Sequence, residues 1–327
     1  MHRLSRSAAA LAFAVAALAA ALFCPRADAQ SRLFQVPCIP ASSAPLCVAE
    51  NAKVLYVDDG DTIDVRIPGA SSHSRVRLTA INATEQSAYN SSPGHQQGEC
   101  HALNANNLLT DLIKRSKGQV RLVYLNRLTR AGVRLVKDVQ VFVNGSWHDT
   151  GSLLVSRGDA LFMPNSREWA WNRSYMVLSQ QAASRGLGLF DTTYCGFGPD
   201  QDIPIKVTVR YDAPGNDTIN PNGEIVRIYN LGTRPLNLAG WWVRDSSPRR
   251  YVFPVGAVVQ PGENITVHVG KGTNSADTYY WGLNTPIFDN PTTDERSIGD
   301  GAYLFDPQGD ARAWQFYPCR IDPCPNS

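Results

Sequence analysis

Three carboxylates surround one glycine in the stretch VDDGDTIDV, residues 57–65. They are Asp58, Asp59 and Asp61. Carboxylate oxygens are ligands that hard divalent cations such as calcium prefer. The ordinary alternative is a polar turn, because Asp bonds to its own backbone and Gly adopts positive φ without strain. The stretch therefore has two interpretations, one half of a cation site or a simple turn.

The segment RVRLTAINATE, residues 75–85, favours the cation site. Side chains alternate along a strand, so Arg75 and Arg77 should project to one face, and the turn that follows carries Asn82 and Glu85. Two loops with oxygen ligands would then lie at strand ends, with an arginine between them.

The surrounding residues, 48–195, predict a small domain of strands and helices. Short β-rich runs bounded by Gly, Asp or Asn occupy 53–57, 62–67, 74–81, 120–125 and 139–143. Apolar spacing and Pro or Gly boundaries predict helices over 98–115, 152–156 and 164–185. Five strands with helices between and after them are typical of a small closed β-barrel, and the OB type is the commonest.

The same residues carry a resemblance. The order DGDT, a strand, RL, a polar turn and Glu, followed by LLVSRG (153–158) and a closing GLGLF, resembles the thermonuclease (staphylococcal nuclease) family over residues 53–190. Members are secreted, calcium-dependent phosphodiesterases on an OB barrel. The resemblance implies that Asp61 binds Ca2+, that Arg77 contacts the scissile phosphate and that Glu85 activates the attacking water.

The second loop departs from the family pattern. INATE stands where the family has a second ligating aspartate, so Asn82 would offer an amide oxygen, and the missing charge should weaken calcium binding. Ala83 occupies the position whose backbone carbonyl is a ligand, a role indifferent to the side chain. Thr84 replaces the usual proline and makes the turn less rigid. Asn82 to Thr84 also matches a glycosylation acceptor pattern.

The second phosphate-binding arginine of the family corresponds to a position in LTRAGVRLVKDVQVFVNG, residues 128–145. Arg134 is the predicted residue because RLV opens a strand, although its spacing to Asn144 is longer than in the family. Arg130 and Lys137 are the alternatives, and each is otherwise a solvated side chain on a loop. If none reaches the phosphate, stabilisation of the transition state falls severely.

From residue 205 onward the helical period is absent. Short strands separated by Pro, Gly and Asn turns are predicted at 206–211, 224–229, 240–244, 265–269 and 302–305, which is typical of a β-sandwich. The order NLG, PLNLAGW, FPVG, PG and GDGAYLFDPQG resembles the lamin-tail domain, an immunoglobulin-like sandwich, over residues 205–317. Of the adjacent Trp241 and Trp242, one should lie in the core and the other at the surface.

This second domain contains no clustered acid, base and nucleophile. We interpret it as a binding or scaffold module whose partner would be the cell envelope or another protein. Arg249 and Arg250 are interpreted as solvated loop residues, with contact to a polyanion as the alternative.

The first 29 residues are predicted to be a secretory signal peptide. Arg3 and Arg6 supply the positive start, residues 8–23 the apolar run and residues 27–29 the cleavage motif, so the mature chain would begin at Gln30. The run is shorter than the roughly 18 residues of a membrane span, and no later segment approaches that length. We expect a secreted, periplasmic or cell-envelope protein with no transmembrane segment after cleavage; an uncleaved anchor is the alternative.

Cleavage would remove Cys24 and leave an even number of cysteines, which in an exported chain predicts disulfides. Proximity favours the pairs Cys38–Cys47 and Cys319–Cys324, and these leave Cys100–Cys195. No cysteine has the CxxC spacing of a zinc site. The histidines His95, His101 and His148 have no metal spacing either and are interpreted as surface or cap residues.

The predicted fold class is mainly β with two domains: an OB-fold β-barrel with helices, like staphylococcal nuclease, and an immunoglobulin-like, lamin-tail-like β-sandwich. The chain would divide into a signal peptide (1–29), a disulfide-containing segment (30–47), the barrel domain (48–195), a linker (196–204) and the sandwich (205–327).

Charge bears on the function. The chain has 31 Lys and Arg against 29 Asp and Glu, so a polyanion would have to bind in a local basic groove. Residues 48–195 carry 16 basic and 13 acidic residues. We expect a secreted Ca2+-dependent nuclease that hydrolyses single-stranded or frayed DNA and RNA, with Phe162 as a core residue or a base-stacking one. The alternative is a non-catalytic exported protein that binds nucleic acid or the envelope on a degenerate nuclease scaffold, with activity lost through Asn82.

Overall fold

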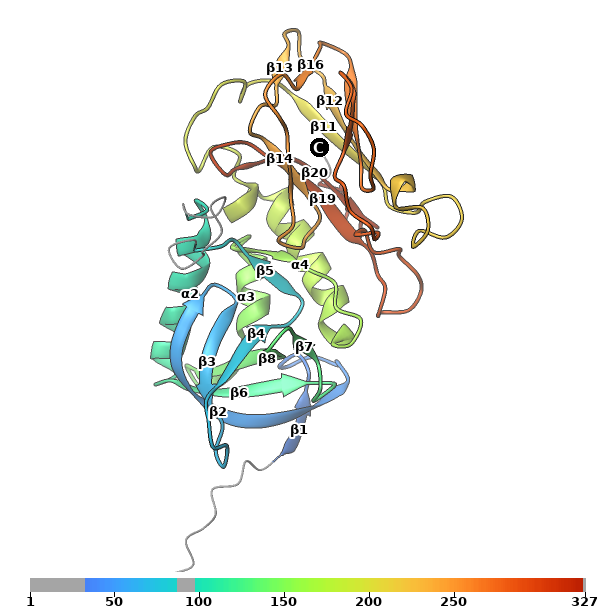
Figure 1. Cartoon of the computed structure of the whole chain (residues 1–327). Helices are drawn as coiled ribbons and strands as arrows, with labels where there is room; N and C mark the ends of the chain where they lie inside the picture. The colour runs from blue at the N-terminus through green and yellow to red at the C-terminus, as the bar shows by residue number, and fades with distance from the viewer. Residues whose placement is uncertain (1–32, 87–97, 326–327) are drawn as a thin grey trace, which may run out of the picture.

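The computed structural model describes residues 33–86 and 98–325 of the chain. The predicted signal peptide, Cys24, Gln30 and His95 lie outside the described residues. The protein is mainly β, with a barrel and helices in the first part of the sequence and two stacked sheets in the second (Figure 1). No helix within the described ranges combines the length and apolar character needed to cross a membrane.

Five strands form a closed hydrogen-bonded ring. They are β2 (Leu46–Asp59), β3 (Thr62–Arg66), β4 (Ser74–Leu78), β8 (Arg134–Val143) and β6 (Gln119–Tyr124). The long strand β2 closes the ring because its first half pairs with β6 and its second half with β3. Register shifts in β2 near Tyr56 and Asp59 let it bend, as bulges do. These are the five strands predicted from the sequence.

Shorter strands extend this framework. β1 (Phe34–Pro37) adds to β2, and β7 (Arg130–Ala131) and β9 (Ser146–Asp149) add to β8. β5 (Ile81–Ala83) and β10 (Ala160–Phe162) form a separate antiparallel pair, which the sequence analysis missed. Phe162 is buried in the core of the barrel, so it does not offer a face for base stacking.

Helix α2 (Ala102–Arg115) covers the barrel near the turn between β2 and β3. Its apolar side buries Ala105, Leu109 and Leu112, and Lys114 and Arg115 occupy its last turn. Gly60 permits this approach, because a Cβ at that position would lie 2.3 Å from the Cβ of Ala105. The helix begins at residue 102, later than the predicted 98.

Two further helices follow. α3 (Thr150–Ser156) is capped by Asp149, whose carboxylate accepts from Ser152 N. The helix predicted over 164–185 is wrong at its start: a 3-10 turn, η3 (Trp169–Trp171), precedes α4 (Asn172–Ser184). Asn165 is the reason, because its side-chain oxygen accepts from the backbone of Arg167 and Glu168 and so forms a local turn that competes with the helix.

The second part of the chain contains two four-stranded sheets. One has the order β11 (Ile205–Arg210), β12 (Ile225–Asn230), β17 (Asn264–His268), β18 (Thr278–Tyr280); the other has β15 (Tyr251–Val252), β14 (Trp242–Arg244), β19 (Asp300–Phe305), β20 (Ala311–Tyr317). β13 (Leu236–Asn237) and β16 (Val258–Val259) form a small pair, and η5 (Pro221–Gly223) precedes β12. The two sheets enclose an apolar core that includes Trp241, whereas Trp242 is half-buried, which confirms the predicted division of roles.

An apolar cluster joins the barrel domain to the sandwich. Its members are Leu161, Ala182, Ala183, Leu189 and Phe190 on one side and Tyr303, Phe305, Ala311, Trp314 and Phe316 on the other. Phe190, in the 3-10 turn η4 (Gly188–Phe190), is central, with its ring 5.1 Å from that of Trp314 and 5.9 Å from that of Phe316. A hydrophobic interface of this kind opposes independent motion of two domains.

Disulfides lie within each part of the chain, and polar contacts hold the segment between the parts. The described cysteines form the pairs Cys38–Cys47, Cys100–Cys195 and Cys319–Cys324, which confirms the favoured pairing. The predicted linker packs on the sandwich: Arg234 forms ion pairs with Asp200 and Asp202. It is therefore held at several points along its length.

Candidate functional site

Neighbouring strands of the ring bring the two polar loops together. Asp61 ends the turn between β2 and β3, and Thr62 is the register partner of Arg77 across the β3–β4 pair. β5 follows β4 after a short turn and carries Asn82 and Ala83. Residues separated by about twenty positions in sequence thereby meet at one place, as expected at the ends of antiparallel strands.

Asp61 is the centre of a buried hydrogen-bond network. Its side chain is 1% exposed. One carboxylate oxygen accepts from Arg77 Nη1 at 2.6 Å and from the hydroxyl of Thr62 at 2.9 Å. The other oxygen accepts from the backbone N–H of Ala83 at 2.9 Å. Charge-assisted bonds of this kind are the strong ones, so the network fixes the loop after β4 against the turn before β3.

Arg77 connects this carboxylate to Asn82. Its Nη2 donates to the side-chain oxygen of Asn82 at 2.7 Å, and both residues are buried. Four of the predicted site residues, Asp61, Arg77, Asn82 and Ala83, are therefore joined in one network. The two side-chain oxygens predicted to bind a metal are both engaged by the arginine.

The other two aspartates of the first loop have different surroundings. Asp58 forms an ion pair with the half-exposed Arg75, which also bonds Asp64. Asp59 accepts from the backbone N–H of Asp61 at 3.0 Å, the bond of an Asp turn. Burial, together with the negative charges of Asp61 and Glu85, raises the pKa of Asp59 to about 7. The stretch is thus both a turn and a concentration of negative charge.

Glu85 follows the network by two residues and is half-buried. Burial raises the pKa of Glu85, as does the charge of Asp61, while the positive charges of Arg77 and Arg134 lower it. Its backbone is held by Glu99: Glu85 N donates to Glu99 Oε2 at 2.7 Å, and Glu99 N donates to the carbonyl of Glu85 at 3.1 Å. A carboxylate with a raised pKa is a better proton acceptor than an ordinary one.

Arg134 lies beside this site, whereas the two alternative cations do not. Its Nη1 is 3.5 Å from the hydroxyl of Thr62, and its charge acts on Glu85. Arg130 instead bonds the carbonyl of Val133. Lys137 is buried, and its Nζ donates to the carbonyls of Asn126 and Arg127. Lys137 is therefore a structural cation and not a loop residue, which corrects the interpretation of it as solvated.

Arg130 and Lys137 line a separate cavity of about 500 Å3. Its other walls include Arg127, Leu128 and Ile67. Burial lowers the pKa of Lys137 to about 8. None of the predicted metal-binding residues lines this cavity.

The donor set around Asp61 fits a calcium ion in chemistry. Oxygen atoms of a carboxylate, an amide and a peptide bond are the ligands that calcium prefers. The carboxylate of Asp61 and the amide oxygen of Asn82 both accept from Arg77, and Ala83 is placed beside them by the bond from its N–H to Asp61. The negative charges of Asp59 and Glu85 repel one another. A cation would reduce that repulsion and would compete with Arg77 for Asp61.

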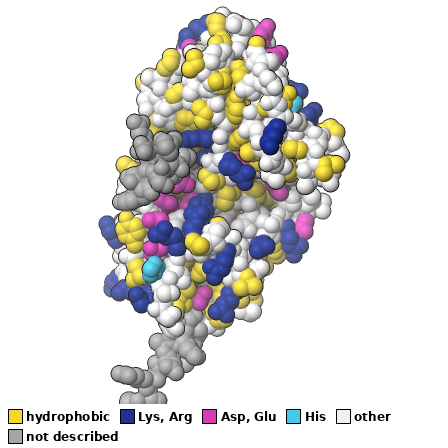
Figure 2. Space-filling model, viewed as in Figure 1, with side chains coloured by type: hydrophobic (Ala, Val, Ile, Leu, Met, Phe, Trp, Pro, Cys, Tyr) yellow, Lys and Arg dark blue, Asp and Glu magenta, His cyan; other side chains and the backbone are white. Residues whose placement is uncertain are grey.

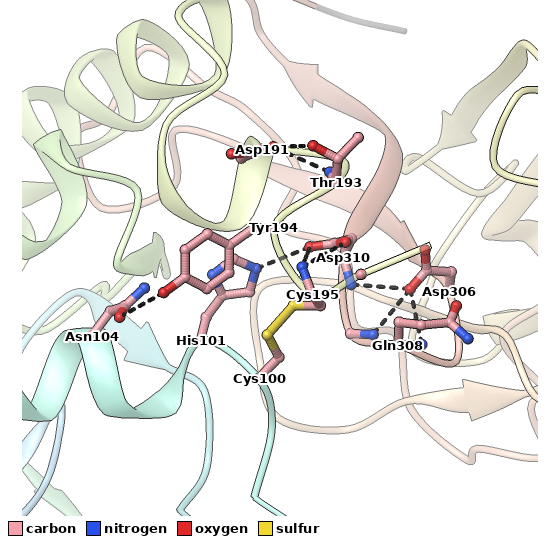
Figure 3. The surroundings of a disulfide bond; sticks show 12 residues. Cys100, His101, Asn104, Asp191, Thr193, Tyr194, Cys195, Asp306, Gln308 and Asp310 are labelled. Atoms are coloured by element: carbon pink, nitrogen blue, oxygen red, sulfur yellow. Dashed lines mark hydrogen bonds and ion pairs between the residues drawn. A yellow bond between two sulfur atoms is a disulfide. The ribbon is translucent and has the colours of Figure 1, made fainter. Parts of the chain in front are cut away.

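Among the described residues, the ligand atoms of Cys100, His101 and Cys195 converge in a geometry that could hold a metal ion. Both sulfurs are engaged in a disulfide, so they are not thiolate ligands. His101 was predicted to be a surface or a cap residue, and it occupies the N-cap position of α2 without a side-chain cap bond. It is not at the surface, since it is 1% exposed and its Nε2 lies 3.3 Å from Asp310 Oδ1 of the sandwich (Figure 3). His148 matches its prediction, being half-buried beside Ser146.

Sequence reasoning missed Glu99 and misplaced Arg250. Arg250 was interpreted as solvated, but its Nη1 lies 3.0 Å from Glu99 Oε1 and its side chain is 18% exposed. Glu99 is preceded by Gly98 and followed by Cys100, and no local pattern marks it as part of a site. What the sequence does show is that Glu99 directly precedes Cys100, and the disulfide of Cys100 fixes the neighbouring backbone.

The face shown in Figure 2 carries Lys and Arg side chains spread over its middle, with Asp and Glu side chains gathered beside them. A mixed surface of this kind offers cations to a polyanion beside a cluster of acids.

Comparison with known families identifies the second domain. Residues 202–318 match the model of the Lamin Tail Domain, which agrees with the resemblance drawn from residues 205–317. No match to a thermonuclease family is found for the barrel. No curated protein matches the chain.

Proposed function

We propose that the protein is a secreted, calcium-dependent nuclease that hydrolyses phosphodiester bonds in DNA or RNA. The observation that carries the proposal is the meeting of Asp61, Arg77, Asn82 and Ala83 in one buried network with Glu85 directly after it. The proposal assigns the closed five-stranded ring to the OB class, whose members bind single strands through basic grooves.

In this mechanism Asp61, the amide oxygen of Asn82 and the carbonyl of Ala83 would hold Ca2+. When bound, the ion supplies positive charge that neutralises phosphate and organises water. Glu85 takes the proton from the attacking water, a role for which its raised pKa suits it. Arg77 and Arg134 donate to the non-bridging oxygens, on which negative charge develops as water attacks phosphorus. The ester P–O bond on the opposite side breaks, and the leaving oxygen takes a proton from solvent.

Arg77 has two partners to exchange in this scheme. It bonds Asp61 and Asn82 in the structure. A bound cation would supply positive charge at Asp61 and Asn82, and Arg77 could then donate to the substrate. The same side chain would therefore neutralise the site before binding and bind phosphate afterwards.

The test is hydrolysis of heat-denatured DNA by the full mature chain, with calcium and with a chelator. Calcium-dependent cleavage that is abolished in Asp61→Ala and Glu85→Gln is the expected result. Asp58→Asn is the matched control, since Asp58 lies in the same turn but pairs with the exposed Arg75. A folded, disulfide-bonded wild-type protein that leaves the DNA intact would refute the proposal.

The second candidate function is binding of nucleic acid or the envelope without catalysis. It is favoured by the engagement of Asp61 and Asn82 with Arg77, which satisfies both oxygens without a metal. Retention of labelled single-stranded DNA by a protein that does not cleave it, equally with calcium and with chelator, would support this alternative.

A further inference from the structure

Glu99 holds the backbone that carries the proposed general base. Glu85 and Glu99 are bonded in both directions, with the Glu85 N–H donating to the Glu99 carboxylate and the Glu99 N–H donating to the Glu85 carbonyl. No strand or helix includes Glu85. Its position therefore depends on this pair of bonds and on the network at Ala83 two residues earlier.

The sandwich holds Glu99 in turn. Arg250, in the loop between β14 and β15, contacts the second carboxylate oxygen of Glu99 at 3.0 Å. The guanidinium of Arg250 lies over the ring of Trp242, 4.8 Å from its centroid, and Trp242 stacks on Phe305 at 5.5 Å. The buried Arg244 of the same sheet adds a second positive charge that acts on Glu99.

Residues adjacent to Glu99 are fixed to the same junction. Cys100 is bonded to Cys195, whose backbone N–H donates to Asp310 of the sandwich. His101 contacts the same Asp310 carboxylate and stacks on Tyr194, with ring centroids 4.7 Å apart (Figure 3). The sandwich therefore contacts Glu99 and His101 directly and holds Cys100 through its disulfide partner Cys195.

We propose that the lamin-tail sandwich is part of the catalytic unit, with Arg250 acting through Glu99 as a positioning residue for Glu85. The inference deepens the proposed function and rests on it. It assigns to the sandwich a task within the reaction, beyond that of a binding or scaffold module.

The experiment measures kcat and KM of the full mature chain on single-stranded DNA. Arg250→Ala should lower kcat by about tenfold to a hundredfold, because small misplacement of a catalytic group costs that much. KM should stay within about twofold, since uniform substrate binding is untouched. Arg250→Lys, which keeps the charge, should recover part of the rate. Arg249→Ala is the matched control, being the exposed neighbour of Arg250.

Two comparisons separate positioning from general destabilisation. If Arg250 acts through Glu99, then Arg250→Ala combined with Glu99→Gln should be no slower than the slower single variant. Urea unfolding of Arg250→Ala and Arg249→Ala provides the second comparison, since a loss of rate without a matching loss of unfolding free energy indicates positioning. The exchange rate of the Glu85 amide hydrogen, measured on the folded variants, should rise in Arg250→Ala and stay unchanged in Arg249→Ala.

The outcomes distinguish this inference from the proposed function. Wild-type cleavage that Glu85→Gln abolishes and Arg250→Ala leaves unchanged would overturn the inference and retain the nuclease. A raised KM with unchanged kcat in Arg250→Ala would also overturn it, because Arg250 would then bind substrate directly. An inactive wild type would overturn both.

Discussion

At the scale of single residues, the site depends on one arginine that serves two acceptors. Arg77 bonds Asp61 and Asn82 at the same time, and all three are buried. A buried ion pair contributes little more than an apolar pair of equal size, but removal of one partner leaves an uncompensated charge. The intact pair therefore adds little to the free energy of unfolding, but replacement of Arg77 should lower that free energy strongly.

Replacement of Arg77 by glutamine should destabilise the barrel. Asp61 would keep its bonds from Thr62 and Ala83 but lose its counter-charge, so the free energy of unfolding should fall by about 3–5 kcal/mol. Urea unfolding of the full chain measures the change. Arg75→Gln is the control: its side chain is 45% exposed, so the loss should be below about 1 kcal/mol. Equal losses in the two variants would contradict the prediction.

Replacement of Asn82 by aspartate should strengthen calcium binding in the proposed site. An additional carboxylate raises the ligand charge, which tunes calcium affinity. We expect the calcium concentration for half-maximal activity to fall by about tenfold, a change of about 1.4 kcal/mol. Calcium titration of DNA cleavage measures it, with Asn51→Asp, in the exposed part of β2, as the control. An unchanged midpoint would mean that residue 82 is no ligand.

The sequence predicted the meeting of some of these site residues and missed the contacts of others. Asp61, Arg77 and Asn82 lie in adjacent strands and turns, so strand alternation and short loops bring them together. The contact of Arg250 with Glu99 joins positions 151 residues apart, and no local period encodes such a contact. His101 was misjudged for the same reason, since its partner Asp310 is 209 residues away.

At the scale of elements, the strands of the barrel were the most predictable part. Their alternation of apolar and polar residues and their Gly, Asp or Asn boundaries are local signals. The start of α4 was less predictable. Asn165 forms a local turn with Arg167 and Glu168 in place of the first helical turn, and the Glu168 carboxylate accepts from the distant backbone of Leu125 and Asn126. The pair of β5 with β10 is too short for a period to be recognised.

The loop that docks on β12 should make the sandwich sensitive to pH. Glu224, just before β12, accepts from the backbone of Ile287 and Phe288, and burial raises its pKa from 4.5 to about 8. An acid with a raised pKa in the folded state stabilises that state when protonated. Its contribution is complete below pH 4.5 and declines until about pH 8.

The free energy of unfolding should therefore fall as pH rises through this window, by on the order of a few kcal/mol from this group. Glu224→Gln keeps the shape of the side chain and does not titrate. The free energy of unfolding of this variant should therefore depend less on pH between about 5 and about 8. Urea unfolding of both proteins across that range provides the measurement. Parallel pH profiles would show that Glu224 stays ionised in the fold.

At the scale of the whole molecule, barrel and sandwich share one apolar junction. The cluster around Phe190 contains residues of both parts, and the linker is bonded along its length. We expect the two parts to unfold together and not in sequence. The resemblance of each half to a separate family did not predict this junction, because each family pattern describes one core.

The disulfides should differ in their effect on stability according to the length of chain they close. Cys100 and Cys195 are separated by 95 residues, whereas Cys319 and Cys324 are separated by 5. Loop-closure entropy gives about 4.7 kcal/mol for the first and about 2 kcal/mol for the second. Replacing both cysteines of each pair by serine and measuring urea unfolding tests this order. A larger loss for the pair at the chain end would contradict it.

The disulfide between Cys100 and Cys195 should also affect how the protein responds to proteolysis. The covalent loop that it closes contains helices α2, α3 and α4 and the ring strands β6 and β8. A single cut between positions 101 and 194 would leave two pieces that the sulfur bridge still ties together. The two pieces of the cleaved chain therefore stay covalently linked, and they can separate only after a second cleavage or reduction of the disulfide.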